Sequence, residues 1–356
     1  LSLGFFNHVG VENYFEELIY IPGNHDHHLW RMYQTQQCII DPLNLIKTQK
    51  SSNTGLQVKQ YPQVIPGYLD LTSASPVLSI SKTNSNGNFL TGLTGKACLP
   101  VRVVYPNLYI LYNDAKGEKS AAIATHGHLF DPGWNIVTDF LLPFFKNQMD
   151  LQHLSLATLE MLNSPVTEAW NYETAQMGAY DVIDTIYDQL LKGTYPPWLN
   201  DLLNVVAVSL KKELSALYSK AHWYEGMQDI VIEFVYNNFD KIKTKLLGCL
   251  KQEILDGVSA TPRYDMQFIQ KNQDRVENYI EMSTKYIKGE SVGTFSRLIF
   301  GHTHVPLFKW PYKFKQLPQV IDFYNTGGWV NIDKTEFPLP LVMNETGDIE
   351  AINLLM

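Results

Sequence analysis

The stretch "SRLIFGHTHVP", residues 296–306, decides the fold class of this 356-residue chain. An apolar run predicts a buried strand, and Gly301 ends that strand directly before His302 and His304. Two imidazoles two positions apart beside a glycine can serve neighbouring metal ions from one tight turn. This pair is therefore a candidate metal-binding turn, with a solvated hairpin turn as the alternative.

Two other predicted strands also end on histidines. "LIYIP" (18–22) predicts a buried strand that breaks at Pro-Gly, and "GNHDHH" follows it at 23–28. "LPVRVVYPNLYILYND" (99–114) and "AKGEKSAAIATHGH" (115–128) predict two strands around a Lys-Gly turn, the second of which runs into His126 and His128.

Seven of the ten histidines lie in these three clusters. Open α/β sheets bind ligands at the carboxyl ends of their strands, so we expect the clusters to converge on one point. Imidazole nitrogens and an amide oxygen suit Mn, Fe or Zn, whereas calcium takes mostly oxygen ligands. The pattern therefore predicts a transition-metal site.

Composition narrows the classes of partner. The net charge is −8 and no block of Lys or Arg stands out, which argues against nucleic acid as a default partner. The three cysteines, Cys38, Cys98 and Cys249, lie too far apart for a thiolate zinc motif and indicate no disulfide framework. With no signal pattern and no membrane-span length of apolar residues, we expect a cytoplasmic protein.

A change in pattern along the chain predicts its division into a core and an insertion. Residues 134–290 place apolar side chains at three- and four-residue intervals and predict a helical insertion or lid subdomain. The α/β core is then formed by 1–133 and 291–356. Residues 41–95 are rich in Ser, Asn, Thr and Gly, and we assign them mainly to irregular loops.

The insertion is expected to rise near the histidine clusters and to select the substrate. Its segment "WNIVTDFLLPFFKNQM" (134–149) is apolar and aromatic and contains Pro143. This segment is a candidate for an acyl-accommodating groove, for peripheral contact with a membrane surface, or for ordinary core. The last of these is favoured, because an apolar stripe is usually buried.

GNHD, HGH and GHTH, in this order and each after a strand, resemble the motifs of the calcineurin-like metallophosphoesterase family. "HGHLFD" and "YNTGGW" (324–329) resemble its bacterial branch of UDP-diacylglucosamine pyrophosphohydrolases. The resemblance implies a layered α/β/β/α sandwich, with two central sheets flanked by helices and a large helical insertion. It also implies two divalent transition metals (Mn, Fe or Zn) and a phosphorylated small-molecule or lipid-linked substrate.

The resemblance also assigns the metal ligands. Asn24, through its side-chain oxygen, would bind the second metal together with His126 and His302, and His304 would bind the first metal. Hydrolysis of a phosphoester or phosphoanhydride by a metal-bound hydroxide is the activity that this dinuclear site implies.

The same resemblance makes His25 the catalytic residue that contacts the phosphate and protonates the leaving oxygen, with Asp26 as its orienting partner. It gives no ligand role to His27, His28 or His128. We expect these three side chains to lie beside the ligands, to face the substrate or to be exposed.

The family pattern begins with an Asp-x-His pair and a Gly-Asp motif whose carboxylate bridges the metals, and neither occurs in this sequence before GNHD. One hypothesis, which we favour, is that the chain is an N-terminal truncation of an active enzyme. The other is a catalytically degenerate homologue that acts as a ligand-binding or protein-interaction module. For the 356 residues alone we expect weak metal binding and little activity.

Overall fold

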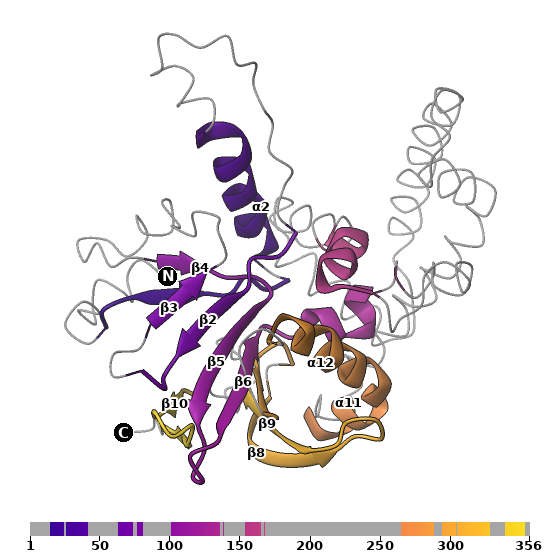
Figure 1. Ribbon diagram of the computed structural model, residues 1–356. Coiled ribbons are helices and arrows are strands. Elements are labelled where there is room, and N and C mark those ends of the chain that lie inside the picture. The colour runs from indigo at the N-terminus through magenta and orange to yellow at the C-terminus, as the bar shows by residue number, and fades with distance from the viewer. Residues whose placement is uncertain are drawn as a thin grey trace.

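The computed structural model describes residues 15–24, 26–41, 63–73, 77–80, 101–135, 138, 154–164, 167, 265–287, 294–303, 305–327 and 339–352. These residues form a mixed α/β structure built on a seven-stranded sheet with the order β3-β2-β5-β6-β7-β9-β8 (Figure 1). The strands are β2 (Gly67–Asp70), β3 (Val77–Ile80), β5 (Asn107–Asn113), β6 (Lys119–Thr125), β7 (Thr294–Phe300), β8 (Pro306–Lys313) and β9 (Val320–Thr326).

Strand direction places the predicted histidine loops at one edge of this sheet. β6 pairs in parallel with β7, and β7 pairs in parallel with β9, so the three strands end on the same side. β5 and β6 pair antiparallel around the predicted Lys116-Gly117 turn. The predicted strands before His126 and His302 are therefore confirmed.

The predicted strand before GNHD is also present, but it lies outside the large sheet. β1 (Leu18–Tyr20) pairs in parallel with β4 (Val101–Val103) in a separate two-stranded sheet. The prediction of one strand over 99–114 was wrong, because β4 and β5 are separate strands. Pro106 has no N–H to donate to a ladder, and the chain changes sheets at this point.

The two sheets pack face to face through alternating side chains. Ile19, in the middle of β1, and Ile21, just after its end, lie on one face and contact a buried cluster that includes Leu108 and Ile110 of β5. The opposite face of β5, with Tyr109 and Leu111, belongs to the main hydrophobic cluster. β5 is thus buried on both faces, as expected for a central strand.

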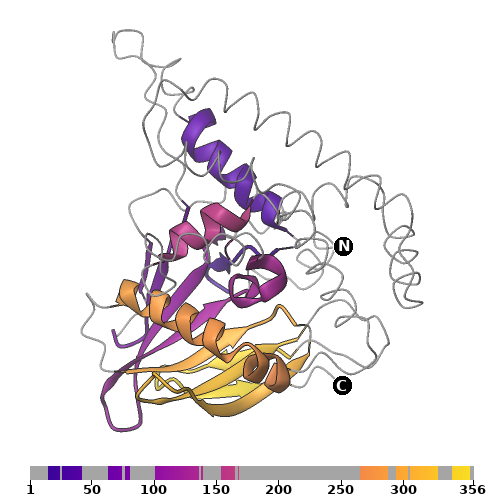
Figure 2. The same cartoon turned by 90° about the vertical axis from the view of Figure 1, so that its right-hand side faces the viewer.

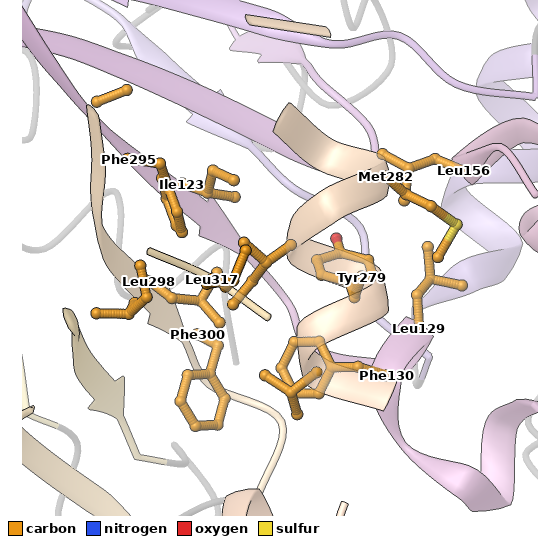
Figure 3. Packing of buried hydrophobic residues seen from close by; sticks show 14 of the residues in the cluster. Ile123, Leu129, Phe130, Leu156, Tyr279, Met282, Phe295, Leu298, Phe300 and Leu317 are labelled. Carbon is orange, nitrogen blue, oxygen red and sulfur yellow. The ribbon is translucent and has the colours of Figure 1, made fainter. Parts of the chain in front are cut away.

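Helices cover the other face of the large sheet. α11 (Asp265–Lys271) and α12 (Gln273–Ile287) lie across it in orange (Figure 2), and the helical residues 156–164 join them. α12 buries Val276, Tyr279, Ile280 and Ile287 at helical spacing. Figure 3 shows Tyr279 beside Phe130 and Met282 beside Leu156, in a cluster that also includes Ile123 of β6 and Phe300 of β7.

A helix also packs against the small sheet. α2 (His27–Thr35), continued by η2 (Gln36–Ile40), packs Trp30 and Tyr33 against Val101 and Val103 of β4. The Trp30 ring stacks on Tyr105, with ring centroids 4.6 Å apart. Helices thus pack against each of the two sheets.

Short elements complete the described structure: η4 (His128–Phe130), η5 (Pro132–Asn135) and a hairpin of β10 (Leu341–Met343) and β11 (Ile349–Ala351). In the predicted insertion 134–290, residues 156–164, α11 and α12 are helical, and most of the other residues lie outside the described ranges. The division into core and insertion stays a prediction. None of the helices within the described ranges is long and apolar enough to cross a membrane.

Candidate metal centre

Three predicted ligands from distant parts of the sequence meet at the carboxyl edge of the sheets. His126 Nε2 lies 2.7 Å from Asn24 Oδ1, and His302 Nδ1 lies 3.1 Å from the same oxygen. The two imidazole nitrogens are 3.3 Å apart. The predicted convergence of Asn24, His126 and His302 is thus present, while their role as metal ligands stays a prediction.

Close packing of the backbone fixes two of these side chains. The backbone oxygen of His126 accepts hydrogen bonds from the N–H groups of Gly301 and His302, at 3.1 and 3.0 Å. The His126 ring lies so close to Gly23 that a Cβ at that position would be 2.6 Å from Nδ1 of the ring. A glycine before Asn24 therefore lets the imidazole approach the loop that carries the amide.

Asp26 holds the same loop. One carboxylate oxygen accepts a 2.6 Å hydrogen bond from the N–H of Gly23, and the other accepts the hydroxyl of Tyr20 on β1. Burial, and then the charge of Asp26, raise the pKa of Tyr20 far above its usual value, so this hydroxyl stays a donor. Asp26 thereby tethers the turn that presents Asn24.

The predicted catalytic role of Asp26 depends on His25, which lies outside the described residues, as does the predicted ligand His304. That role stays a prediction. The contacts of Asp26 with Gly23 and Tyr20 give it a structural task that the sequence did not suggest.

Asp131 orients the ring of His302, and the sequence did not predict this role for Asp131. Its Oδ2 lies 2.8 Å from His302 Nε2, and both side chains are largely buried. A carboxylate that accepts the N–H on one side of an imidazole fixes the tautomer and leaves the other nitrogen free of a proton. The segment "HGHLFD" contains this aspartate. The 3₁₀ turn η4, from His128 to Phe130, brings the carboxylate of Asp131 back toward the histidines.

The orientation of the Asn24 amide leaves room for a cation at the centre of the donor set. When Asp131 accepts Nε2–H, the neutral His302 ring presents a lone pair at Nδ1 to the Asn24 oxygen. A rotated amide would give both imidazoles an N–H donor, yet Oδ1 faces inward and Nδ2 is buried without a hydrogen-bond partner among the described residues. An inward oxygen between imidazole nitrogens can accept an N–H from one ring or share a bound cation with both.

The separations of these atoms also fit a metal site. Bonds of about 2.1 Å at angles from about 90° to the tetrahedral value put neighbouring ligand atoms roughly 3.0 to 3.4 Å apart. The observed separations of 2.7, 3.1 and 3.3 Å fall close to that range. Within the described ranges no group of three or more His, Cys, Asp or Glu side chains is placed to hold a metal, so the centre depends on the Asn24 amide.

The end of β9 supports the turn that follows β7. Asn325, in the segment "YNTGGW", is fully buried and donates a 2.5 Å hydrogen bond to Thr303 Oγ1. Its Oδ1 accepts the N–H of Gly327 at 2.9 Å. Asn325 therefore ties the turn containing His302 to the neighbouring strand.

An aromatic side chain stands beside the cluster. The ring of Trp134, in η5, approaches the ring of His302 edge to face, with centroids 6.4 Å apart. Its position gives the centre an apolar neighbour and a built-in fluorophore.

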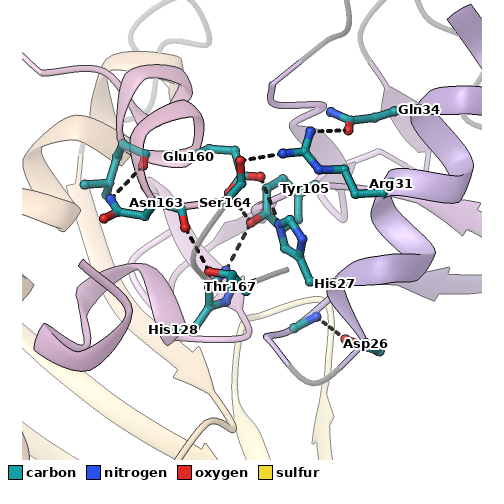
Figure 4. A network of polar contacts seen from close by, with 12 residues as sticks. Asp26, His27, Arg31, Gln34, Tyr105, His128, Glu160, Asn163, Ser164 and Thr167 are labelled. Carbon is teal, nitrogen blue, oxygen red and sulfur yellow. Dashed lines mark hydrogen bonds and ion pairs between the residues drawn. The ribbon is translucent and has the colours of Figure 1, made fainter. Parts of the chain in front are cut away.

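Two of the histidines without a predicted ligand role are buried rather than exposed. His27 Nε2 lies 2.9 Å from Glu160 Oε1, and the Tyr105 hydroxyl donates to Glu160 Oε2 at 2.6 Å. The same hydroxyl lies 3.0 Å from His128 Nε2 (Figure 4). The contact between His27 and Glu160 could not be predicted from the sequence, because Glu160 lies on a helix more than a hundred positions after His27.

Comparisons with known proteins found no matching family model, no similar curated protein and no similar solved structure.

Proposed function

We propose that Asn24, His126 and His302 bind a divalent transition metal, and that the complete protein hydrolyses a phosphoester or phosphoanhydride as calcineurin-like metallophosphoesterases do. The observation that carries the proposal is the meeting of two imidazole nitrogens and one amide oxygen from three separate motifs. The packing of helices against each of the two sheets supports it, since the α/β/β/α sandwich is the family's architecture.

Each described residue has a task in this proposal. Asn24 offers an oxygen and the two histidines offer nitrogens, a set that suits Mn, Fe or Zn. Asp131 keeps His302 in the tautomer whose Nδ1 is free to bind. The cation would supply Lewis-acid stabilisation of charge on a phosphoryl oxygen.

Two further residues of the proposed site, His25 and His304, lie outside the described ranges. His304 would bind another metal, and His25, assisted by Asp26, would protonate the leaving oxygen. The substrate class is a phosphorylated small molecule or a lipid-linked phosphate, with the residues 134–290 as a selecting lid.

A second candidate function is a ligand-binding or protein-interaction module on the same fold. Before GNHD the sequence contains neither an Asp-x-His pair nor a Gly-Asp motif. In the hydrolase, a bridging carboxylate from such a motif would neutralise much of the repulsion between two cations. Such a module would retain a single metal without turnover.

Metal analysis and hydrolysis of an artificial phosphodiester distinguish the two functions. We expect purified protein to bind Mn²⁺, and His302→Ala and His126→Ala each to lose that binding while far-ultraviolet circular dichroism is retained. His28→Ala, on α2, is the matched control and should bind as the wild type does. Turnover that falls with metal removal supports the hydrolase, metal without turnover supports the module, and wild-type binding by both ligand variants would refute the site.

A further inference from the structure

Glu160 is a buried carboxylate on a segment remote from the motifs. It lies in the helical residues 156–164, which occur in the chain between β6 and β7, and its side chain is 1% exposed. Its two oxygens take different partners: His27 of α2 at Oε1 and Tyr105 at Oε2. Carboxylates this deeply buried are rare unless they are paired, so we expect the two contacts of Glu160 to have a specific role.

A chain of contacts leads from Glu160 to the metal centre. The Tyr105 hydroxyl, fixed by Glu160 at 2.6 Å, lies 3.0 Å from His128 Nε2. The His128 ring in turn lies against His126 and His302, with ring centroids 5.4 and 6.5 Å away. Because buried aromatic rings pack densely, a displaced His128 ring would shift its neighbours.

A second contact fixes the same segment to α2. Arg31 donates a 2.5 Å hydrogen bond to Ser164 Oγ and a 2.9 Å bond to Gln34 Oε1 (Figure 4). Ser164 is one helical turn beyond Glu160, so the two contacts restrain both the position and the rotation of this helix. The segment therefore has a defined place beside the centre.

We propose that Glu160 is a positioning residue for the metal centre, acting through Tyr105 and His128, so that docking of the helical residues 156–164 sets how tightly the metal is held. This inference rests on the proposed metal-binding function and adds its regulation. Departure of the 156–164 helix would release Tyr105 and His128 and weaken the centre.

Two tyrosine variants test the link. Tyr105→Phe removes the hydroxyl that joins Glu160 to His128, and we expect Mn²⁺ affinity to fall about ten-fold or more. Tyr109→Phe is the matched control, because its buried hydroxyl accepts from Asn107 and donates to Ser283, and no described histidine is among its hydrogen-bond partners. We expect this control to bind Mn²⁺ within about two-fold of the wild type.

Equal losses of affinity in both tyrosine variants, or an unchanged affinity in Tyr105→Phe, would overturn the inference. Glu160→Gln gives a second measurement, since its amide oxygen can still accept from Tyr105. We expect it to retain more affinity than Glu160→Ala, and the reverse order would also overturn the inference. If the wild type itself takes no Mn²⁺, the proposed function fails first, whereas wild-type binding with an unaffected Tyr105→Phe variant rejects only the role of Glu160.

Discussion

Replacing Asp131 by Asn tests the mechanism that prepares His302 for a metal. The substitution keeps the size of the side chain and removes the charge that accepts from His302 Nε2 at 2.8 Å. Loss of such an outer partner typically costs about 10- to 100-fold in metal affinity, which corresponds to about 1.4 to 2.7 kcal/mol. We place Asp131→Asn in the upper part of this range, because the two side chains are only 14% and 8% exposed and water compensates poorly for the lost negative charge.

The assay is a competition titration of Mn²⁺ or Zn²⁺ against a chelator at pH 7.5. Asp274→Asn makes the same chemical change at an exposed position in the first turn of α12, and it should leave the dissociation constant unchanged. A melting experiment in chelator separates affinity from folding. Equal dissociation constants for Asp131→Asn and the wild type would refute the idea that this carboxylate orients a metal-binding imidazole.

Glycine packing, tyrosine ionisation and tryptophan fluorescence each give a further prediction. Gly23→Ala should lower metal affinity at least ten-fold, because the new Cβ would lie 2.6 Å from the His126 ring, whereas Gly117→Ala, with open space around its Cβ, should alter only stability. Burial raises the pKa of Tyr105, Tyr109 and Tyr279 above the usual 10.0, so their protonated forms stabilise the fold fully below pH 10. As the unfolded chain loses these protons above pH 10, the free energy of unfolding should fall by at most about 1.4 kcal/mol per pH unit for each tyrosine, and the melting temperature should fall with it; a flat profile to pH 11.5 would contradict this. Paramagnetic Mn²⁺ should quench tryptophan fluorescence through Trp134, and an equal quench in Trp134→Phe would show that the metal binds elsewhere.

The strands that position the centre were predictable because they carry strong local signals. The apolar runs before His126 and His302 are each closed by a turn, and both are central strands of the large sheet. Central strands are buried on both faces, and in β6 and β7 the residues that lead up to the histidines are accordingly apolar. Their ends could therefore be placed from the sequence.

The elements that were missed lie at the margins of the sheet. β8 contains Pro306 and Pro311, which argue against a strand, yet β8 is an edge strand where a missing N–H leaves no ladder bond broken. β2 and β3 are four residues each, and they lie in the polar range 41–95 that was assigned to loops. Short edge strands depend on their neighbours more than on their own sequences.

The residues around the ligands were the least predictable part of the site. The sequence motifs contain Asn24, His126 and His302. The contacts of Asp131 and Glu160 join residues that are far apart in the sequence, and no motif spacing predicts them. Asn325 lay within a recognised segment, although its task, the hydrogen bond to Thr303, appears only in the folded chain. Supporting residues of this kind are fixed by geometry in three dimensions.

The most direct test of the metal centre is anomalous diffraction at the manganese edge from crystals grown with Mn²⁺. We predict a peak about 2.0 to 2.3 Å from Asn24 Oδ1, His126 Nε2 and His302 Nδ1 together. A fully loaded crystal with no peak among these three atoms would contradict the account.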